Sequence, residues 1–147
     1  MVQLRRRSGF TLIEVLIVIV VIAVLAAIVV PRLLGAGRQA KESSLRAHLQ
    51  ELRNATALFQ AQTGTYPGDL QDVAEPSFAN IVNPTGGVTI AESDWNGPYV
   101  TTVDGNLPNN PITGANAEGV DWGYDVATGG ITAAAGSALD GSDYSSW

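Results

Sequence analysis

The chain has 147 residues, which corresponds to one domain. It contains no cysteine, so no disulfide bond can support a small core. All eight lysine and arginine residues precede residue 54, whereas eleven acidic residues and no basic ones follow residue 63. This acidic part repels phosphate backbones, which disfavours nucleic acid as a partner.

The N-terminal segment combines three arginines with a long apolar run. Residues 5–7 are arginines, Gly9 follows, and the 21 residues 10–30 carry a single charge, that of Glu14. A helix of this length is ~31 Å long, which matches the hydrocarbon core of a bilayer. We therefore expect it to span a membrane with the arginines on the cytoplasmic side. An acid inside such a segment is costly and indicates a function.

Three interpretations of this segment are open. One is a secretory signal cleaved after Val24-Leu25-Ala26, although the run of 21 residues exceeds the ~7–15 of a usual signal. A second is an anchor that is not cleaved. Neither explains Glu14, nor why Gly9 directly precedes the run.

The third interpretation comes from a resemblance. Residues 9–35, GFTLIEVLIVIVVIAVLAAIVVPRLLG, resemble the N-terminus of type IV pilins and type II secretion pseudopilins. The resemblance implies that prepilin peptidase removes residues 1–9 as a leader, cutting between Gly9 and Phe10, and methylates the new amine of Phe10. It also implies that Glu14 neutralises the Phe10 amine of a neighbouring copy in a helical filament. The alternative for Glu14 is a side chain that reaches the lipid headgroups.

The helix is expected to continue beyond the membrane to Thr63. Five side chains recur at spacings of four, three, four and three, which is one helix face: Leu45, Leu49, Leu52, Thr56 and Phe59. Glu42 and Arg46 form an i,i+4 pair expected on the surface. Gly64 is expected to cap the helix C-terminus. The helix thus divides into an apolar filament-core segment, 10–31, and an amphipathic segment, 32–63.

Pro31 interrupts the hydrogen bonding of this helix and predicts a kink. Gly35 and Gly37 follow it and weaken the helix further. The resemblance implies that the region around Pro31 loses helix in filaments, and the alternative is a kink that the helix tolerates.

Residues 64–147 are expected to form a globular head. Residues 98–103 predict a strand, and residues 121–135 predict a hairpin that turns at Ala127–Gly130. Trp122, Tyr124 and Val126 alternate, so they are expected to share the face directed at the helix. The predicted fold class is therefore α+β, pilin-like, with a long N-terminal helix kinked near Pro31 and packed on a small antiparallel sheet.

Short motifs in the head, TYPGDLQDV, WNGPYV, LPNNPITG and WGYDV, resemble the major pseudopilin of type II secretion. The resemblance implies a structural filament subunit, and no catalytic constellation is present in the sequence. It also implies a precursor in the bacterial inner membrane and then a periplasmic or cell-surface filament. The expected partners are further copies of the chain, prepilin peptidase, an assembly platform and minor pilins. A surface type IV pilin and a membrane-anchored binding module that does not polymerise are the alternatives.

No cofactor is expected to be required, and calcium is the candidate structural ion. Major pseudopilins bind calcium in a loop near the C-terminus, which the resemblance places in AGSALDGSDYSSW, residues 135–147. The candidate ligands are the carboxylates of Asp140 and Asp143 and oxygens of Ser137, Leu139 or Ser142. Asp121 and Asp125 are weaker candidates, because a hairpin can direct them to solvent. The alternative is an acidic tail without a bound ion.

Overall fold

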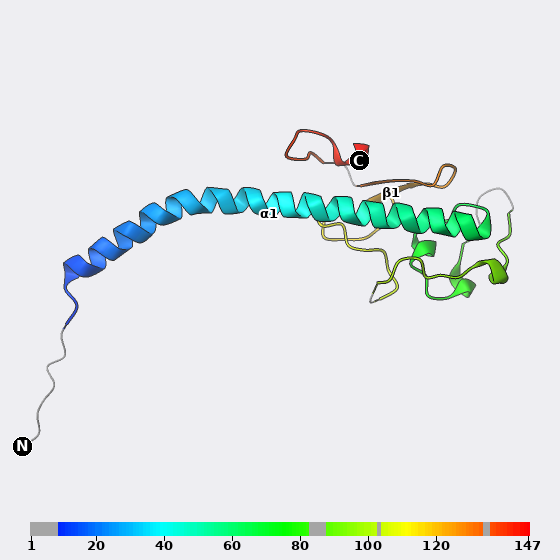
Figure 1. The fold of residues 1–147 in the computed structure, drawn as a ribbon, viewed down its shortest axis with the longest axis horizontal. Coiled ribbons are helices and arrows are strands. Elements are labelled where there is room, and N and C mark those ends of the chain that lie inside the picture. The colour runs from blue at the N-terminus through cyan, green and yellow to red at the C-terminus, as the bar shows by residue number, and fades with distance from the viewer. Residues whose placement is uncertain (1–8, 83–87, 103, 134–135) are drawn as a thin grey trace, which may run out of the picture. The chain divides into compact units, whose positions relative to one another are not determined.

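The computed structural model describes residues 9–82, 88–102, 104–133 and 136–147, and of Leu34 the backbone only. The elements (Figure 1) are helix α1 (Leu12–Thr63), 3-10 helices η1 (Leu70–Val73), η2 (Phe78–Asn80) and η3 (Glu92–Asp94), strands β1 (Trp122–Asp125) and β2 (Gly130–Ala133), and 3-10 helix η4 (Tyr144–Ser146). The chain divides into two compact units, Met1–Arg38 and Gln39–Trp147, and α1 contributes to both.

The first unit consists, in its described part, of the apolar portion of α1 and the residues that precede it. The large apolar side chains from Leu12 to Val30 are 48–85% exposed, so the described residues of this unit do not form a core. Within the described residues, α1 is the helix long and apolar enough to cross a membrane. It continues through Pro31 and is bent over its N-terminal half (Figure 1), so the expected kink is present as a bend.

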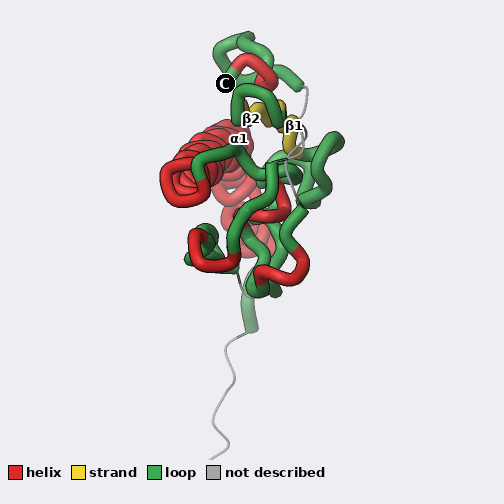
Figure 2. The backbone as a smooth tube through the Cα atoms, turned by 90° about the vertical axis from the view of Figure 1, so that its right-hand side faces the viewer, coloured by secondary structure: helices red, strands yellow, loops and turns green. Residues whose placement is uncertain are grey.

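The second unit is built on the remainder of α1. The predicted helix face is confirmed, because Leu45, Leu49, Leu52, Thr56 and Phe59 are each at most 2% exposed. This face packs in one cluster with apolar side chains of the head, among them Leu70, Val73, Val100, Trp122 and Ile131. Figure 2 shows the strands and loops gathered on one side of α1, which leaves its other side uncovered. Full burial of each leucine contributes ~1.5–3 kcal/mol.

The C-terminal end of α1 follows the sequence prediction. Gly64 adopts a φ of 78°, and its N–H donates to the Gln60 carbonyl at 2.9 Å. A side chain at this left-handed position would be strained, so glycine is the residue that ends the helix most readily.

The predicted hairpin is confirmed over its described residues. Strands β1 and β2 pair antiparallel, with Trp122 opposite Ala133 and Asp125 opposite Gly130. Trp122 is fully buried and donates from its indole N–H to the Pro108 carbonyl at 2.9 Å. The last two residues of the predicted hairpin, 134 and 135, lie outside the described residues.

The strand predicted at residues 98–103 is wrong for its described part, 98–102. The N–H groups of Tyr99 and Val100 both donate to the carbonyl of Val73, the last residue of η1, at 2.8 and 2.9 Å, so they are bound to η1 instead of a neighbouring strand. Val100 is buried nevertheless, which explains the apolar pattern that predicted a strand.

Candidate assembly site

The N-terminus of α1 is capped by Thr11 and Glu14. The Thr11 N–H and hydroxyl donate to Oε2 of Glu14 at 2.8 and 2.7 Å, and the Glu14 N–H donates to the Thr11 hydroxyl oxygen at 3.3 Å. This reciprocal pattern is a capping box, which satisfies N–H groups that have no partner inside the helix. Sequence reasoning had singled out Glu14 and missed Thr11, although Thr-x-x-Glu before an apolar run is a recognisable signal.

The predicted processing point, Gly9–Phe10, lies immediately before this capping box. Both residues are outside the helix, and the Phe10 side chain is 84% exposed. The arginines at 5–7 and the rest of the predicted leader lie outside the described residues. The peptide bond between Gly9 and Phe10 is therefore part of an irregular segment, the kind of backbone on which a peptidase acts most easily.

Pro31 lies inside α1 and is followed by two glycines in exposed positions. A Cβ atom at Gly35 or Gly37 would meet no atom within 4 Å, so packing in the subunit does not require glycine at either position. Each glycine costs ~1 kcal/mol of helix stability relative to alanine, and Pro31 removes one backbone donor. The segment around them is helical here but weakly held.

The predicted calcium ligands lie in a tight turn near the C-terminus. Asp140 accepts hydrogen bonds from the Ser142 N–H and hydroxyl at 2.9 and 2.6 Å, and Asp143 accepts two from Ser145 at 2.8 Å. These bonds lower the pKa of both carboxyl groups, so both are charged at neutral pH. Leu139 contributes its N–H to Glu42 of α1.

No group of three or more His, Cys, Asp or Glu side chains that could hold a metal ion occurs in the described part of the chain. Calcium takes six to eight oxygen ligands. Two carboxylates fall short of that number, so the site also needs serine oxygens and loop carbonyls. Calcium binding therefore stays a prediction.

The C-terminal segment is held to α1 by side chains whose role sequence reasoning missed. Glu42 is not on the surface as expected but 6% exposed, and it accepts hydrogen bonds from the Leu139 N–H at 2.8 Å and the Tyr144 hydroxyl at 3.1 Å. The Arg46 guanidinium lies 3.9 Å from the centre of the Trp147 ring. Their partners are ~100 residues away in sequence, so no local pattern pointed to them.

A cluster of carboxyl groups joins η1 to the loop before β1. The Leu70 N–H donates to Glu118 at 2.7 Å, and the Glu118 carboxyl is hydrogen-bonded to that of Asp69. Burial and this contact raise the pKa of Glu118 to about 7. Burial likewise raises the pKa of Asp72 to about 6, although three backbone N–H groups donate to it. No basic residue follows Arg53 in the sequence to oppose these shifts.

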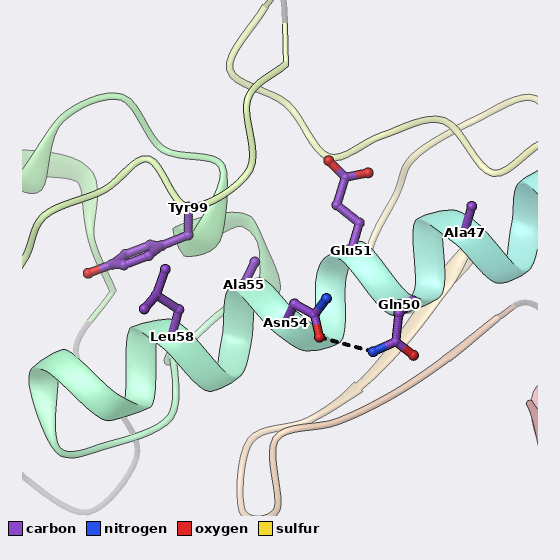
Figure 3. Close-up of a pocket in the computed structure, with 7 residues that line it drawn as sticks. All are labelled: Ala47, Gln50, Glu51, Asn54, Ala55, Leu58 and Tyr99. Atoms are coloured by element: carbon purple, nitrogen blue, oxygen red, sulfur yellow. Dashed lines mark hydrogen bonds between the residues drawn. The ribbon is translucent and has the colours of Figure 1, made fainter.

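A hollow of about 490 Å³ lies where α1 meets the part of the head that carries Tyr99 (Figure 3). Ala47 and Leu58 lie at its two ends, and Tyr99 borders it from the head. Gln50 donates to Asn54 at 2.9 Å along its floor. Its lining lacks the paired nucleophile and base of a hydrolytic site, and its mixed apolar and amide surface is suited to contact with another protein surface.

An exposed apolar helix with a capped acid in its first turn, continuing into a small α+β head, defines a pilin-like membrane protein. Residues 4–30 match the model of the prokaryotic N-terminal methylation motif. The chain is 32% identical to type II secretion system core protein G of Aeromonas hydrophila over 74% of this chain and 70% of that protein. It is 30% identical to core protein G of Escherichia coli K12, over 78% and 84% of the two chains.

The chain therefore belongs to the family of type II secretion system core protein G, the major pseudopilins, whose members are structural and not enzymatic. It is also similar to the type IV narrow pilus major component PilA5 of Thermus thermophilus, at 35% identity over 74% of this chain and 86% of that protein. No solved structure matches this chain significantly.

Proposed function

We propose that this protein is the major pseudopilin of a type II secretion system, a structural subunit that polymerises through its N-terminal helix into a filament. The observation that carries this proposal is the exposed apolar half of α1 with one acid at its start. Such a surface is stable in lipid or against other copies of itself, and not in water. Membership of the core protein G family supports the same function.

In this proposal, cleavage between Gly9 and Phe10 leaves the apolar helix attached and creates a positive amine at Phe10. A buried amine and a buried carboxylate each cost several kcal/mol unless they are paired. Glu14 of one copy pairs with the Phe10 amine of the next, and this pair sets the axial register, as a polar residue does in the core of a coiled coil. Before assembly, the Glu14 carboxylate accepts hydrogen bonds from the N–H and the hydroxyl of Thr11 in the same subunit.

The precursor resides in the bacterial inner membrane, and the assembled filament extends into the periplasm. Prepilin peptidase removes residues 1–9 and methylates Phe10. An assembly platform and minor pilins take part in polymerisation. The basis for these partners is the methylation motif at residues 4–30 and the relatives that share it.

The N-terminus of the protein isolated from membranes tests the proposal. Mass spectrometry should find a chain that begins at Phe10 and carries one extra methyl group. A chain that begins near Ala27 would indicate a secretory signal, and a chain that retains Met1 would indicate an uncleaved anchor. Either result would reject processing as a pseudopilin.

A surface type IV pilus is the second candidate function, favoured by the similarity to the Thermus thermophilus pilin. Deletion of the gene separates the two. Loss of a pseudopilin should leave secreted enzymes in the periplasm, whereas loss of a pilin should remove fibres from the cell surface and leave secretion intact.

A further inference from the structure

A second, smaller hollow of the head is lined by two arginines. It has a volume of about 270 Å³ and is bounded by Arg46, Leu49, Gln50, Arg53 and Trp147. Arg46 and Arg53 are seven residues apart in α1, two helical turns, so both point to the same side of the helix. We call this hollow the arginine hollow.

Both guanidinium groups are fixed in place by the fold. Arg46 stacks on the Trp147 ring at 3.9 Å, which leaves the edges of its planar group directed away from the ring. Arg53 donates from one nitrogen, Nη2, to the carbonyls of Ile131 and Trp147. A guanidinium carries five N–H donors, so each arginine retains donors suited to a carboxylate, although Arg46 also lies close enough to Asp140 of its own chain to lower the pKa of that carboxyl group.

The head supplies an acid that suits this hollow. Almost every acidic side chain in the described residues from 64 onward accepts a hydrogen bond from its own chain, and Glu92 is the exception. Glu92 begins η3 beside Asp94, and both are exposed. No lysine or arginine follows Arg53, so nothing basic in this part of the sequence can neutralise them.

Glu92 of the same copy is placed away from its own arginine hollow. Trp95, which follows η3, packs on Phe78 of η2 at 6.0 Å between ring centres, and Tyr99 donates to Gln62 in the last turn of α1. Gln62 is 12 residues beyond Gln50, or ~18 Å along the helix. The segment that follows Glu92 is thus anchored near the C-terminal end of α1, beyond the arginine hollow.

We propose that the arginine hollow receives Glu92 and Asp94 of a neighbouring copy of the chain, an inference that rests on the proposed filament. Two different, complementary surfaces at different positions along the helix axis make a heterologous contact. Such a contact can repeat from copy to copy without closing into a ring, and it then builds a filament. Copies inserted in a membrane share one orientation, so a displacement along the axis brings the positive hollow of one copy to the level of the acidic surface of another. Charge complementarity of this kind fixes register and suppresses wrong contacts.

Cysteine crosslinking tests the contact directly, because the natural chain has no cysteine. The full chain with Gln50→Cys and Glu92→Cys should give a ladder of covalent oligomers when assembled filaments are mildly oxidised. The matched control pairs Gln50→Cys with Asp125→Cys, at the exposed end of β1, and should give no ladder. Filaments that form but give no more ladder than the control would overturn the contact and leave the proposed function intact.

Charge exchange is the second test. Glu92→Arg should reduce filament yield about tenfold, which corresponds to ~1.4 kcal/mol per subunit for a like-charge contact. Adding Gln50→Glu, which places an acid in the hollow and leaves both arginines in place, to Glu92→Arg should restore most of the yield. Asp125→Arg, with the same change in net charge as Glu92→Arg, should have little effect. Undiminished assembly of Glu92→Arg would overturn the contact. A natural chain that forms no filament would reject the proposed function and this contact together.

Discussion

The two halves of α1 belong to one helix but have opposite environments. From Leu12 to Val30 every large apolar side chain is about half exposed or more, whereas Leu45, Leu49 and Leu52 are at most 1% exposed. The second half is covered on one side by its own head, whereas the large apolar side chains of the first half are not buried by any of the residues that the structure describes. This contrast indicates that the second half of α1 is stabilised by packing against its own head, whereas the apolar half is stable only in lipid or against other copies of the chain.

The largest effect should come from a change in the apolar half that leaves the head untouched. Glu14→Val removes the acid and makes the segment more apolar, so membrane insertion should survive while filaments are lost. Fractionation of membranes and electron microscopy of filaments measure the two outcomes separately. Thr11→Val, which removes a cap of Glu14 but keeps the acid, should assemble better than Glu14→Val. Filaments of Glu14→Val at the normal yield would contradict the pairing of Phe10 with Glu14.

A matched pair of apolar truncations should separate the halves by stability. Leu52→Ala creates a cavity in the core of the head and should lower the free energy of unfolding by ~2–5 kcal/mol. Val21→Ala, in the exposed half, should leave unfolding of the head unchanged. Thermal melting of the full chain in detergent measures both effects. Equal losses of stability in the two variants would show that the two halves of α1 unfold in one cooperative transition.

The attachment of the C-terminal segment to α1 predicts a smaller loss. Glu42→Ala leaves the Leu139 N–H and the Tyr144 hydroxyl without this acceptor, which should cost ~1–3 kcal/mol. Glu51→Ala, an exposed acid on the same helix, is the control and should change stability little. Denaturant unfolding of residues 39–147 gives both values, and equal values would assign Glu42 no special role.

The acidic cluster of the head predicts a dependence on pH that the apolar half lacks. The pKa of Glu118 is raised to about 7 and that of Asp72 to about 6. At a pH between the ordinary pKa of each carboxyl group and its raised pKa, the folded head therefore binds more protons than the unfolded chain. Stability should therefore fall as pH rises from 5.5 to 8. Glu118→Gln should flatten this slope, whereas Asp125→Asn should not, because the lowered pKa of Asp125 acts at more acidic pH. An unchanged slope in Glu118→Gln would contradict the assignment.

Calcium should have the smallest effect, through the turn at Asp140 and Asp143. An ion that binds only the folded head raises its melting temperature, and EDTA reverses the rise. Asp140→Ala should abolish the rise, with Asp125→Ala as the control acid outside the turn. No shift at millimolar calcium in the natural chain would favour the acidic tail without an ion.

Features that depend on residues a few positions apart could be predicted from the amino-acid sequence. The buried face of α1, its end at Gly64 and the hairpin follow from periodicity and glycine chemistry, and they are present as predicted. Glu14 and the Gly9–Phe10 junction came from the resemblance, and the capping box that holds Glu14 was also encoded locally, in Thr11.

Tertiary structure alone decided which polar groups are buried and what they contact. Glu42 has the i,i+4 spacing of a surface pair, yet its hydrogen-bond partners come from residues 139 and 144. Residues 98–102 have the composition of a strand, but the N–H groups of Tyr99 and Val100 donate to the Val73 carbonyl. The pKa of Glu118 depends on Asp69, 49 positions earlier in the sequence. Burial and charge proximity are set by segments far apart in the chain, and no local periodicity records which of them meet.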